Sequence, residues 1–555
     1  MSTGHLDLAD IQGNIVRAYG RFGFRFARYY FLRIKPGQQT QGRAFIDQLR
    51  PWVTSAVRWQ DGANASAPDA VPAPDSTLNI AFTFYGLLAL GLPTKTLARM
   101  PPEYIDGMAA RSFILGDEGP NAPEHWDAIW QQADAEPANA EAAGRVHVWI
   151  SMNARSPDQL ASSHDRLMSA IDRHAGDVEL LAGHGPDKLP YQDASVIFRN
   201  EGGQPVPTAK EHFGFTDGIG DPVFDGRYEP DTEAKRVVGR GKLLPDQTWA
   251  PLATGEFLLG HADESQELPQ VAPPWEFTRN GSFMVYRKLH ENVKSFHDYI
   301  DEQAERFARV LGLDPTNRDH RTRARETLMA KMAGRWTDGI PLLAAATFDD
   351  WQRVRAQWQD IPAIRMKRER TPQEQSRLDA YNRMLIDFKY GDDQGGTKCP
   401  YGAHIRRANP RDMLDPMLKS PDPSERTGSS LNKRRRIMRR GLPYGTVDAD
   451  NPTDDGEHGI IFIAICASLS RQFEFVQQQW MQYGLDFNVG NDTCPIVGRH
   501  DATTKFVVAA DPADDRPPYI CAEIPQFVTT RGGDYFFIPS LNALRMIAEG
   551  SVDPT

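Results

Sequence analysis

Short runs of apolar and aromatic residues recur in the first third of the chain and predict β-strands. Residues 24–34 (FRFARYYFLRI) and 145–152 (RVHVWISM) are rich in aromatic and β-branched side chains, which favour strands. Residues 78–84 alternate between apolar and polar positions, the period expected of a strand with one buried face. We therefore expect three strands in this part of the chain.

Apolar positions with helical spacing separate these strands. Residues 156–173 carry them three and four positions apart, and Pro157 stands near the start, where a helix accepts proline. Residues 45–57 are expected to be largely helical, with Pro51 as a break. The order of strand, helix, strand, strand and helix favours an α+β domain of the ferredoxin-like type, with an antiparallel sheet and helices on one face.

The same pattern starts again in the second half of the chain. Residues 280–289 predict a strand after a turn, and residues 292–311 predict an amphipathic helix. Residues 459–467 form an apolar run typical of a buried strand. We infer a second domain of the same class. Further elements are expected at residues 469–483 (helix), 534–539 (strand) and 540–549 (helix).

Chain length supports this division, because 555 residues exceed what one hydrophobic core usually accommodates. We expect an N-terminal ferredoxin-like domain at residues 1–210, a connecting segment at residues 211–270 and a C-terminal ferredoxin-like domain at residues 271–555. The expected fold class is α+β, with two tandem ferredoxin-like domains whose antiparallel sheets have peripheral helices.

Charge and cysteine usage exclude some classes of partner. The formal net charge of −11 argues against a general binder of nucleic acid or of anionic membranes. No apolar span approaches the ~18 residues of a membrane helix, and no export leader or twin-arginine signal is visible at the start. The four cysteines show neither CxxC nor zinc-type spacing, as in proteins of a reducing compartment. We expect a cytoplasmic protein.

Residues 399–411 (CPYGAHIRRANPR) combine one histidine with space and positive charge. The small residues before His404 leave room beside the imidazole for a large group, and the arginines after it could hold an anion. A flat apolar body with acidic groups, bound through one imidazole, describes haem. A lone histidine in such a setting is more often an ordinary turn or core residue, so this stretch needs support from elsewhere. The arginines in question are Arg406, Arg407 and Arg411.

Two further stretches carry candidate chemistry. Residues 211–222 (EHFGFTDGIGDP) form a tightly turning, glycine-rich loop around Asp217, whose carboxylate either caps backbone amides or serves as an acid–base group. Residues 433–445 (KRRRIMRRGLPYG) resemble a basic nucleic-acid patch. However, the apolar pair inside this run and the Leu-Pro-Tyr-Gly at its end fit a strand or turn with one inward arginine better.

Five segments act together as landmarks: residues 10–15 (DIQGNI), 214–218 (GFTDG), 399–411, 437–445 (IMRRGLPYG) and 534–539 (DYFFIP). In this order they resemble the dye-decolourising peroxidase family, among its larger, bacterial-type members. The landmarks span nearly the whole chain. A single GxxDG would be a weak signal, whereas GxxDG followed by GAHIRRxNPR and IMRxGxPYG is specific.

The resemblance implies one haem b per chain, held between the two ferredoxin-like domains. His404 corresponds to the proximal ligand of the iron, which makes the C-terminal domain the haem-ligating one. Asp217, in the connecting segment, corresponds to the distal acid–base residue, and Arg439 corresponds to the distal arginine.

Four more positions take their expected roles from the resemblance. Arg407 matches the family's arginine for a haem propionate, and Ile460 and Phe462 match the apolar residues over the distal face. Glu474 is the expected acceptor for the second N–H of the proximal imidazole. Gly441 stands where some subfamilies have asparagine, so a third polar distal residue is missing from this chain.

The implied reaction is the oxidation of bulky aromatic donors, such as dyes and phenols, by hydrogen peroxide in one-electron steps. Cleavage of peroxide needs a base that moves one proton and a cation that stabilises the developing charge. An aspartate whose pKa is lowered by a neighbouring arginine stays ionised in acidic solution. We therefore expect an acidic pH optimum, with peroxide and aromatic reductants as the partners and neither nucleic acid nor membrane.

Other functions remain open at this stage. A porphyrin- or haem-processing enzyme, similar to a deferrochelatase, would use the same cofactor as its substrate. A non-catalytic haem-binding protein would not need the pair of Asp217 and Arg439. An α+β protein without haem is the simplest alternative. Assembly as a homo-oligomer, or as the cargo of a protein shell, also remains open.

Overall fold

The strands of both halves of the chain form one antiparallel sheet in the computed structural model, which describes residues 6–60, 70–131, 145–269, 271–367, 369–448, 451–510 and 516–553. Within these ranges the sheet has ten strands in the order β11-β13-β10-β16-β2-β3-β1-β4, with β12 beside β13 and β5 beside β1. The bounds are β1 Phe26–Ile34, β2 Ser76–Phe82, β3 Val148–Ala154, β4 Val178–Leu180, β5 Gln192–Ser195, β10 Ser282–Glu291, β11 Met438–Arg439, β12 Leu442–Tyr444, β13 Gly459–Cys466 and β16 Val528–Ile538.

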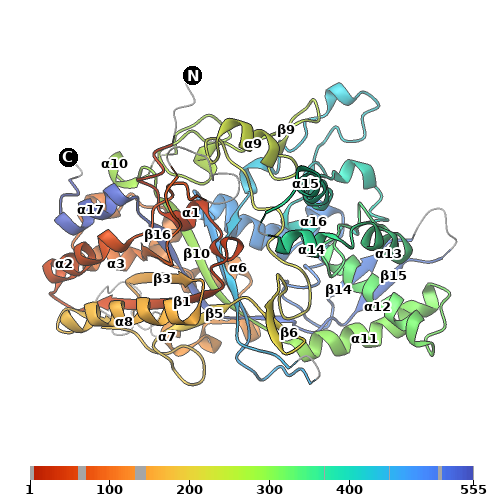
Figure 1. Ribbon diagram of the computed structural model, residues 1–555, viewed down its shortest axis with the longest axis horizontal. Coiled ribbons are helices and arrows are strands. Elements are labelled where there is room, and N and C mark those ends of the chain that lie inside the picture. Colours follow the sequence, from red (N-terminus) through yellow and green to blue (C-terminus); the bar gives the residue numbers. More distant parts are fainter. Residues whose placement is uncertain are drawn as a thin grey trace.

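The N-terminal strands confirm the predicted pattern of buried positions. β2 and β3 are buried along almost their whole lengths, and each pairs with a neighbour over seven residues. The helices α2 (Gln39–Leu49) and α8 (Pro157–Arg173) pack beside these strands, and α17 (Leu541–Glu549) packs against α2 (Figure 1). The hydroxyl of Ser156 caps α8, as the serine–proline start predicts.

One helix boundary differs from the prediction. The first of the predicted helices, α2, begins at Gln39 rather than at residue 45, because its polar first turn continues the helix without adding to the apolar stripe. It ends at Leu49, and a short 3₁₀ turn at Arg50–Trp52 follows, so Pro51 acts as the expected break.

The C-terminal strands form the other part of the sheet. β10 lies between β13 and β16, and Leu289 and Arg287 of β10 stand opposite Ile460 and Phe462 of β13. Because strand residues two apart share a face, these side chains point to the same side of the sheet. The two parts meet where Phe537 of β16 pairs with Phe82 of β2. The predicted α+β class with antiparallel strands is confirmed, whereas the expected domain boundaries stay predictions.

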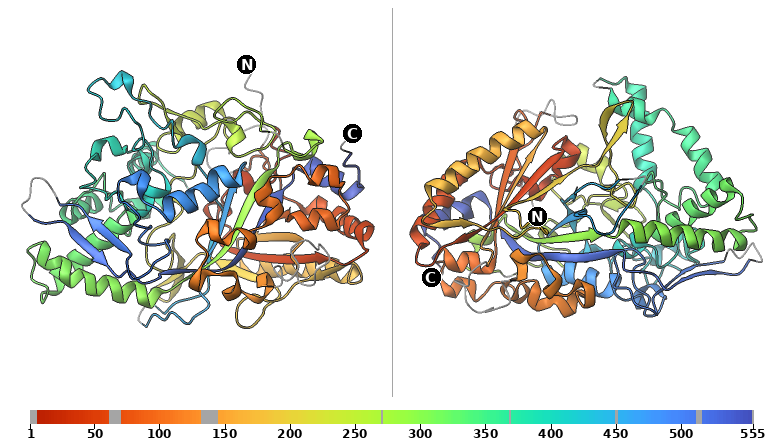
Figure 2. Two further views of the ribbon diagram at one scale, coloured as in Figure 1. Left: turned by 180° about the vertical axis from the view of Figure 1, so that it is seen from behind. Right: turned by 90° about the horizontal axis from the view of Figure 1, so that it is seen from below.

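A group of helices lies beyond the C-terminal strands, on the right of Figure 1 and in the right-hand view of Figure 2. The sequence predicted the amphipathic α11 but not α12. Residues 327–333 of α12 are all buried, so its apolar and polar positions do not separate into the two faces that mark a helix in a sequence. The bounds are α11 Val293–Val310, α12 Arg318–Ala333, α13 Phe348–Gln357, α14 Ile361–Met366 and α15 Pro372–Ile386.

The predicted helix at residues 469–483 is present in an unusual form. It consists of two consecutive π-helical segments, Leu469–Glu474 and Val476–Met481. Phe473, Val476 and Trp480 of this segment are buried. π-Helical turns are often associated with functional sites, and this segment packs against the short helix α16 (His404–Ala408).

The remaining elements are short and connect these parts. The helices are α1 Gly13–Val16, α3 Phe84–Ala89, α4 Thr94–Leu97, α5 Pro102–Asp106, α6 Ser112–Leu115, α7 Ala128–Gln131, α9 Pro230–Arg236 and α10 Trp275–Thr278. The strands are β6 Phe198–Glu201, β7 Gln204–Pro207, β8 Lys242–Leu243, β9 Trp249–Ala250, β14 Lys505–Val508 and β15 Tyr519–Ala522, which form three two-stranded hairpins.

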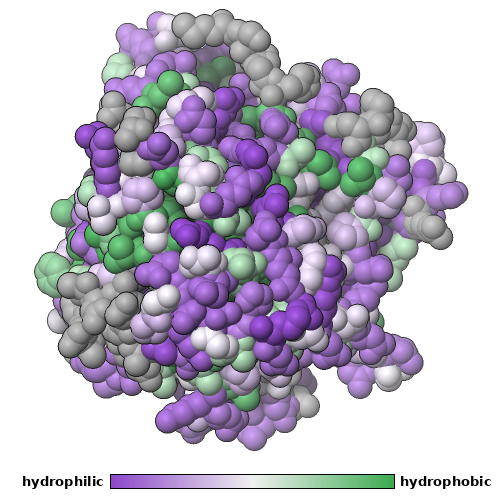
Figure 3. Space-filling view, turned by 90° about the vertical axis from the view of Figure 1, so that its left-hand side faces the viewer, coloured by the Kyte–Doolittle hydropathy of each residue, from purple (hydrophilic) through white to green (hydrophobic). Residues whose placement is uncertain are grey.

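The outer surface is mainly polar on the face shown in Figure 3, which views the end of the molecule that carries α2, α8 and α17. Hydrophilic residues cover most of this face, and hydrophobic residues gather in small groups between them. In the described part of the chain, no helix combines the length and the apolar character needed to cross a membrane.

Candidate functional site

A deep cavity of about 560 Å³ lies between the C-terminal strands and α16. Ile460 and Phe462 line it from the sheet, and His404 lines it from the helix. The glycine-rich loop at residues 208–222 forms another wall, and Asp117 extends the lining into the N-terminal half. This volume is within the range of cofactor and ligand sites, and the lining is more apolar than polar.

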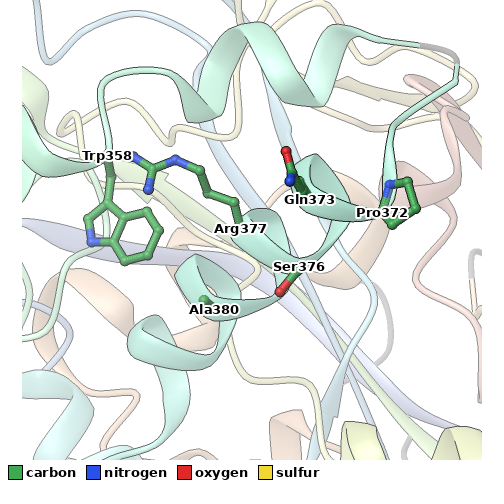
Figure 4. Close-up of a pocket in the computed structure, with 6 residues that line it drawn as sticks. All are labelled: Trp358, Pro372, Gln373, Ser376, Arg377 and Ala380. Carbon is green, nitrogen blue, oxygen red and sulfur yellow. The ribbon is translucent and has the colours of Figure 1, made fainter.

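A second hollow, of about 460 Å³, is a shallow feature of the outer surface beside α15. Figure 4 shows Arg377 extending over the ring of Trp358 there, and Arg377 also forms an ion pair with Asp360. No predicted site residue lies in it, so we place the chemistry in the deep cavity. Its lining residues are Trp358, Pro372, Gln373, Ser376, Arg377 and Ala380.

His404 is the first residue of α16 and lines the cavity. Its Nδ1 atom lies 3.3 Å from Sγ of Cys494, a residue 90 positions away in the chain. Within the described residues, no hydrogen-bond partner is found for Nε2. One ring nitrogen is therefore engaged by the protein, and the other is free to bind a ligand in the cavity.

Asp217 and Arg439 are in direct contact, although 222 residues separate them. Nη1 of Arg439 donates to Oδ1 of Asp217 at 2.7 Å. Both side chains are nearly half exposed, at 46% for Asp217 and 44% for Arg439, and both line the cavity. The loop after β7 and the strand β11 thus bring the predicted acid and the predicted arginine together.

The environment of Asp217 favours its ionised form. Burial alone would raise the pKa of the carboxyl, but the charge and hydrogen bond of Arg439, the N–H of Gly218 and the charge of Arg21 act in the opposite direction. The net result is a pKa below the ordinary value. In turn, Asp217 raises the pKa of Arg439, so the pair is a carboxylate and a guanidinium.

A second carboxylate extends this charged wall. Asp221 accepts hydrogen bonds from Arg227 at 2.7 Å and from Arg440 at 3.0 Å, and these cations hold its pKa well below the usual range despite burial. Arg21 also lines the cavity. Sequence reasoning missed these roles, although Asp221 and Arg440 lie inside the two motifs, because a motif does not show which of its charges meet.

Ile460 and Phe462 lie in the cavity wall, where the prediction places them. They are two residues apart on β13 and therefore share a face of the sheet. Leu289, opposite Ile460 on β10, lines the same wall. The sheet side of the cavity is thus largely apolar around the Asp217–Arg439 pair.

The structure contradicts the expected role of Arg407. Its side chain is fully buried and does not line the cavity. Its guanidinium donates to the backbone oxygens of Trp480 at 2.8 Å, Tyr483 at 3.1 Å and Asp492 at 2.6 Å. These contacts fasten α16 to the second π-helical segment and to the residues that follow it, so Arg407 is not available to hold a propionate.

The structure also contradicts the expected role of Glu474. Its carboxylate accepts from Arg111 at 2.5 and 2.7 Å and from the hydroxyl of Tyr535 at 2.8 Å. These bonds occupy both oxygens and direct the side chain towards β16 and the N-terminal half, away from His404. The sulfur of Cys494 occupies the place beside the imidazole that we had expected Glu474 to take.

Three other arginines form a cationic wall in the cavity: Arg335, Arg411 and Arg436. Each donates to backbone oxygens, and no ion pair is found for any of them among the described residues. Burial lowers the pKa of Arg335 to about 10 and that of Arg436 to about 9. Buried cations without a counter-charge are costly, so this wall fits an anionic group.

These features fit haem. His404 lines the cavity and its Nδ1 is engaged by Cys494, which leaves Nε2 as the nitrogen that could ligate the iron of a haem. The apolar sheet wall suits the porphyrin faces, and the unpaired cations suit its two carboxylates. Of the arginines that follow His404 in the motif, Arg411 lies in the cationic wall, whereas Arg406 is buried against Asp393.

Gly441 is required by the packing of the sheet. A Cβ atom at this position would lie 1.6 Å from the backbone oxygen of Ile461. A larger residue would therefore push β12 away from β13, the strand that carries Ile460 and Phe462. Steric contact explains why the polar residue of some subfamilies is absent here.

Two further carboxyl groups, Glu211 and Glu291, both line the cavity and influence each other's pKa. Burial raises the pKa of Glu211 to about 7, and burial together with the charge of Glu211 raises that of Glu291 well above its ordinary value. The pair therefore holds a proton near neutral pH. The sequence motif that contains Glu211 gave no signal of this pair, because Glu291 lies outside the motif, at the end of β10.

Comparison with known proteins finds similarity to one family. Residues 344–487 match the family described as Dyp-type peroxidase, C-terminal. Peroxidase 2 of Mycetinis scorodonius is 27% identical over 561 residues, which cover 97% of this chain and 87% of that protein. The multifunctional dye peroxidase DyP2 of an Amycolatopsis species is 27% identical over 568 residues, which cover 97% and 96%.

Solved structures show the same fold. The crystal structure of AauDyP complexed with imidazole, a protein of Auricularia auricula-judae, matches with a TM-score of 0.67 and 23% identity, and covers 98% of this chain and 100% of that chain. A DyP-type peroxidase of an Anabaena species matches with a TM-score of 0.65 and 20% identity, over 97% and 94%. At such identities the likeness concerns the fold, and it agrees with two tandem ferredoxin-like units.

Proposed function

Because this chain belongs to the family of Dyp-type peroxidases, which are haem enzymes, we propose that it binds one haem b in the deep cavity and oxidises bulky aromatic donors with hydrogen peroxide. His404 would ligate the iron through Nε2. Arg335, Arg411 and Arg436 would hold the carboxylates of the cofactor. Bound haem supplies the iron at which peroxide is reduced.

The observation that carries this proposal is the contact between Asp217 and Arg439 on the wall of the same cavity as His404. The ionised carboxylate of Asp217 accepts the proton of peroxide and delivers it to the oxygen that leaves as water. The guanidinium of Arg439 stabilises negative charge on that oxygen and keeps Asp217 ionised beforehand. A protein that only stores haem has no use for this pair.

The apolar side chains of Ile460 and Phe462 limit what can approach the pair. Together with Leu289 they form a wall that excludes water from one side of Asp217 and leaves space for a molecule as small as peroxide. Bulky dyes and phenols would deliver electrons from outside this wall. A dye-decolourising peroxidase has been solved as a complex with 2,6-dimethoxyphenol, which supports aromatic compounds as the donor class.

The decisive experiment is a haem titration followed by one equivalent of peroxide, read in the Soret region. We expect the wild type to bind one haem per chain and its spectrum to change rapidly, whereas His404→Ala loses or grossly alters the Soret band. The exposed His125 gives a matched control, and His125→Ala should behave as the wild type. Asp217→Asn should bind haem normally and react with peroxide roughly 10²–10⁴-fold more slowly.

The alternatives give different results in this experiment. Binding without reaction would support a storage protein, and conversion of the added haem to iron-free porphyrin would support a haem-processing enzyme. Absence of binding would overturn the proposal. The cytoplasm remains our proposal for its location, supported by four buried cysteines without a disulfide bond, as is common in reducing compartments. Fractionation of cells that express the protein would test it.

A further inference from the structure

The partner of the candidate iron ligand is a cysteine rather than a carboxylate. Sγ of Cys494 lies 3.3 Å from Nδ1 of His404, which is hydrogen-bond distance for sulfur. The thiol is completely buried. Carboxylates, backbone carbonyls and water are the usual partners of metal-binding histidines, so a sulfur in this place is an unusual choice.

The neighbouring carboxylates form hydrogen bonds or ion pairs with residues other than His404. Glu474 is bound by Arg111 and Tyr535, and the carboxylate of Asp492 lies 3.0 Å from Nζ of Lys505. Neither reaches His404. Among the described residues, Cys494 is the hydrogen-bond partner found for Nδ1.

The backbone around Cys494 holds its sulfur in a defined position. The N–H of Cys494 donates to the oxygen of Met481 at 2.7 Å. Its own oxygen accepts from the N–H of Gly498 at 3.0 Å and from Nε2 of His500 at 2.9 Å. Three hydrogen bonds therefore hold the backbone of Cys494, one of them from the side chain of His500, and this fixes the position of the sulfur.

Arg407 connects the same segment to the helix of His404. It belongs to α16, and its guanidinium binds the backbone oxygens of Trp480 and Asp492, the latter two residues before Cys494. One side chain thus fixes the distance between the helix and the segment that carries the sulfur. The arginine that we had expected to meet a propionate instead supports the contact of His404 with Cys494.

We propose that Cys494 is the positioning residue of the proximal histidine: its sulfur accepts the Nδ1 proton of His404 and holds the ring with Nε2 towards the cavity. This inference rests on the proposed function, because it assigns His404 to iron. A ring nitrogen that binds a metal has no proton, so the proton lies on Nδ1 and the sulfur is the acceptor. Arg407 holds α16 and the segment of Cys494 together and so keeps His404 and Cys494 in contact.

The choice of sulfur has a consequence for the iron. An acceptor on Nδ1 makes the imidazole a stronger electron donor, which favours the ferric over the ferrous state. A thiol sulfur is a weak acceptor, whereas a carboxylate forms a stronger, charge-assisted hydrogen bond. The iron of this protein should therefore be easier to reduce than it would be with an aspartate at the same position.

The test is the midpoint potential of the ferric–ferrous couple, measured by spectroelectrochemistry on the haem-loaded protein. We expect Cys494→Asp to lower the potential and Cys494→Ala to raise it relative to the wild type. The iron–histidine stretching frequency of the ferrous protein should change in the same order. Cys521→Ala removes another buried thiol from the same half of the molecule, and it should leave both quantities unchanged.

Equal potentials in the wild type, Cys494→Asp and Cys494→Ala would overturn the proposal. If Cys494→Ala fails to retain haem, the comparison of Cys494→Asp with the wild type decides alone, because aspartate keeps an acceptor at the position. The proposed function fails separately: it is wrong if the wild type binds no haem or if His404→Ala binds it unchanged. If haem binding depends on His404 but the midpoint potential is the same in the wild type and in the variants of residue 494, the role of Cys494 is refuted and the proposed function stands.

Discussion

At the scale of single residues, Arg439 is the largest of the influences that oppose burial in setting the pKa of Asp217. The carboxylate lines the deep cavity and is nearly half exposed to it; desolvation by the surrounding protein raises its pKa, and yet the net pKa is lowered. In the proposed reaction the arginine therefore has two effects: it would stabilise the developing negative charge, and it keeps Asp217 ionised beforehand. These effects can be separated by changing the cation without touching the carboxylate.

Replacement of Arg439 by leucine should move the acidic limb of the pH–rate profile to higher pH. Without the cation, burial dominates and the pKa of Asp217 rises, so more of the carboxyl is protonated at a given acidic pH. Arg439→Lys keeps a charge and should shift the limb less. The measurement is the rate of peroxide reaction in stopped flow from about pH 3 to 8. Unshifted profiles would argue against Asp217 as the base.

At the scale of elements, α16 is a short helix whose position matters more than its own stability. It has five residues, too few for a stable isolated helix, and it begins with the candidate ligand. Arg407 fastens it to the second π-helical segment, whereas Arg411, just after the helix, lies in the cavity wall. The two arginines thus serve the helix in different ways.

The pair of variants Arg411→Gln and Arg407→Gln should separate these roles. Loss of the Arg411 charge is expected to weaken haem binding by roughly 10–100-fold, as for one charge-assisted hydrogen bond. Arg407→Gln should mainly lower the unfolding temperature of the haem-free protein, because it leaves buried backbone oxygens without donors. Haem titration and thermal melts measure the two effects. If Arg407→Gln weakened haem binding more than Arg411→Gln does, Arg407 and not Arg411 would be the arginine that holds a propionate.

At the scale of the whole molecule, buried ion pairs reinforce the joint between the two halves. The sheet crosses the joint at the pairing of Phe82 with Phe537. Nearby, Arg287 of β10 donates to both carboxylate oxygens of Asp117 at 2.6 and 2.8 Å, and Thr530 of β16 completes the network. Arg287 and Asp117 are 4% and 2% exposed, so solvent screens this pair very little.

Replacement of Asp117 by asparagine should destabilise the protein by about 3–5 kcal/mol, because it leaves the charge of Arg287 buried without a partner. The surface pair of Lys294 and Asp298 gives a matched control, and Asp298→Asn should change the stability little. Chemical unfolding of both variants tests this. Similar losses in the two variants would show that the joint does not depend on the buried pair.

Much of the fold could be predicted because its signals are local. The strands at β1, β2, β3, β10 and β13 follow the period and composition of their own residues, and Ser156 and Pro157 mark the start of α8. The helix α12 could not be predicted, since its buried residues lie on all sides. Its identity as a helix depends on the neighbours that surround it.

The site divides in the same way. His404, Asp217 and Arg439 stand in motifs, and the structure brings them to one cavity. The assignments of Arg407 and Glu474 were wrong, because the direction of a side chain depends on contacts with distant segments. Cys494 had no signal in its own neighbourhood, and its role appears when a residue 90 positions away is placed beside it.

The position of β16 has a consequence for the time course of biosynthesis. It is the last strand in chain order in the described ranges, yet it lies between β10 and β2 in the middle of the sheet, and its residues Val528 and Thr530 line the cavity. On a ribosome, the 236 residues between Glu291 and Val528 (residues 292–527) take on the order of 10–50 s to synthesise. During that interval β10 and β2 both lack their common neighbour. The nascent chain therefore depends on protection of these edges, and the cavity wall that contains Val528 and Thr530 is completed only after β16 has been synthesised.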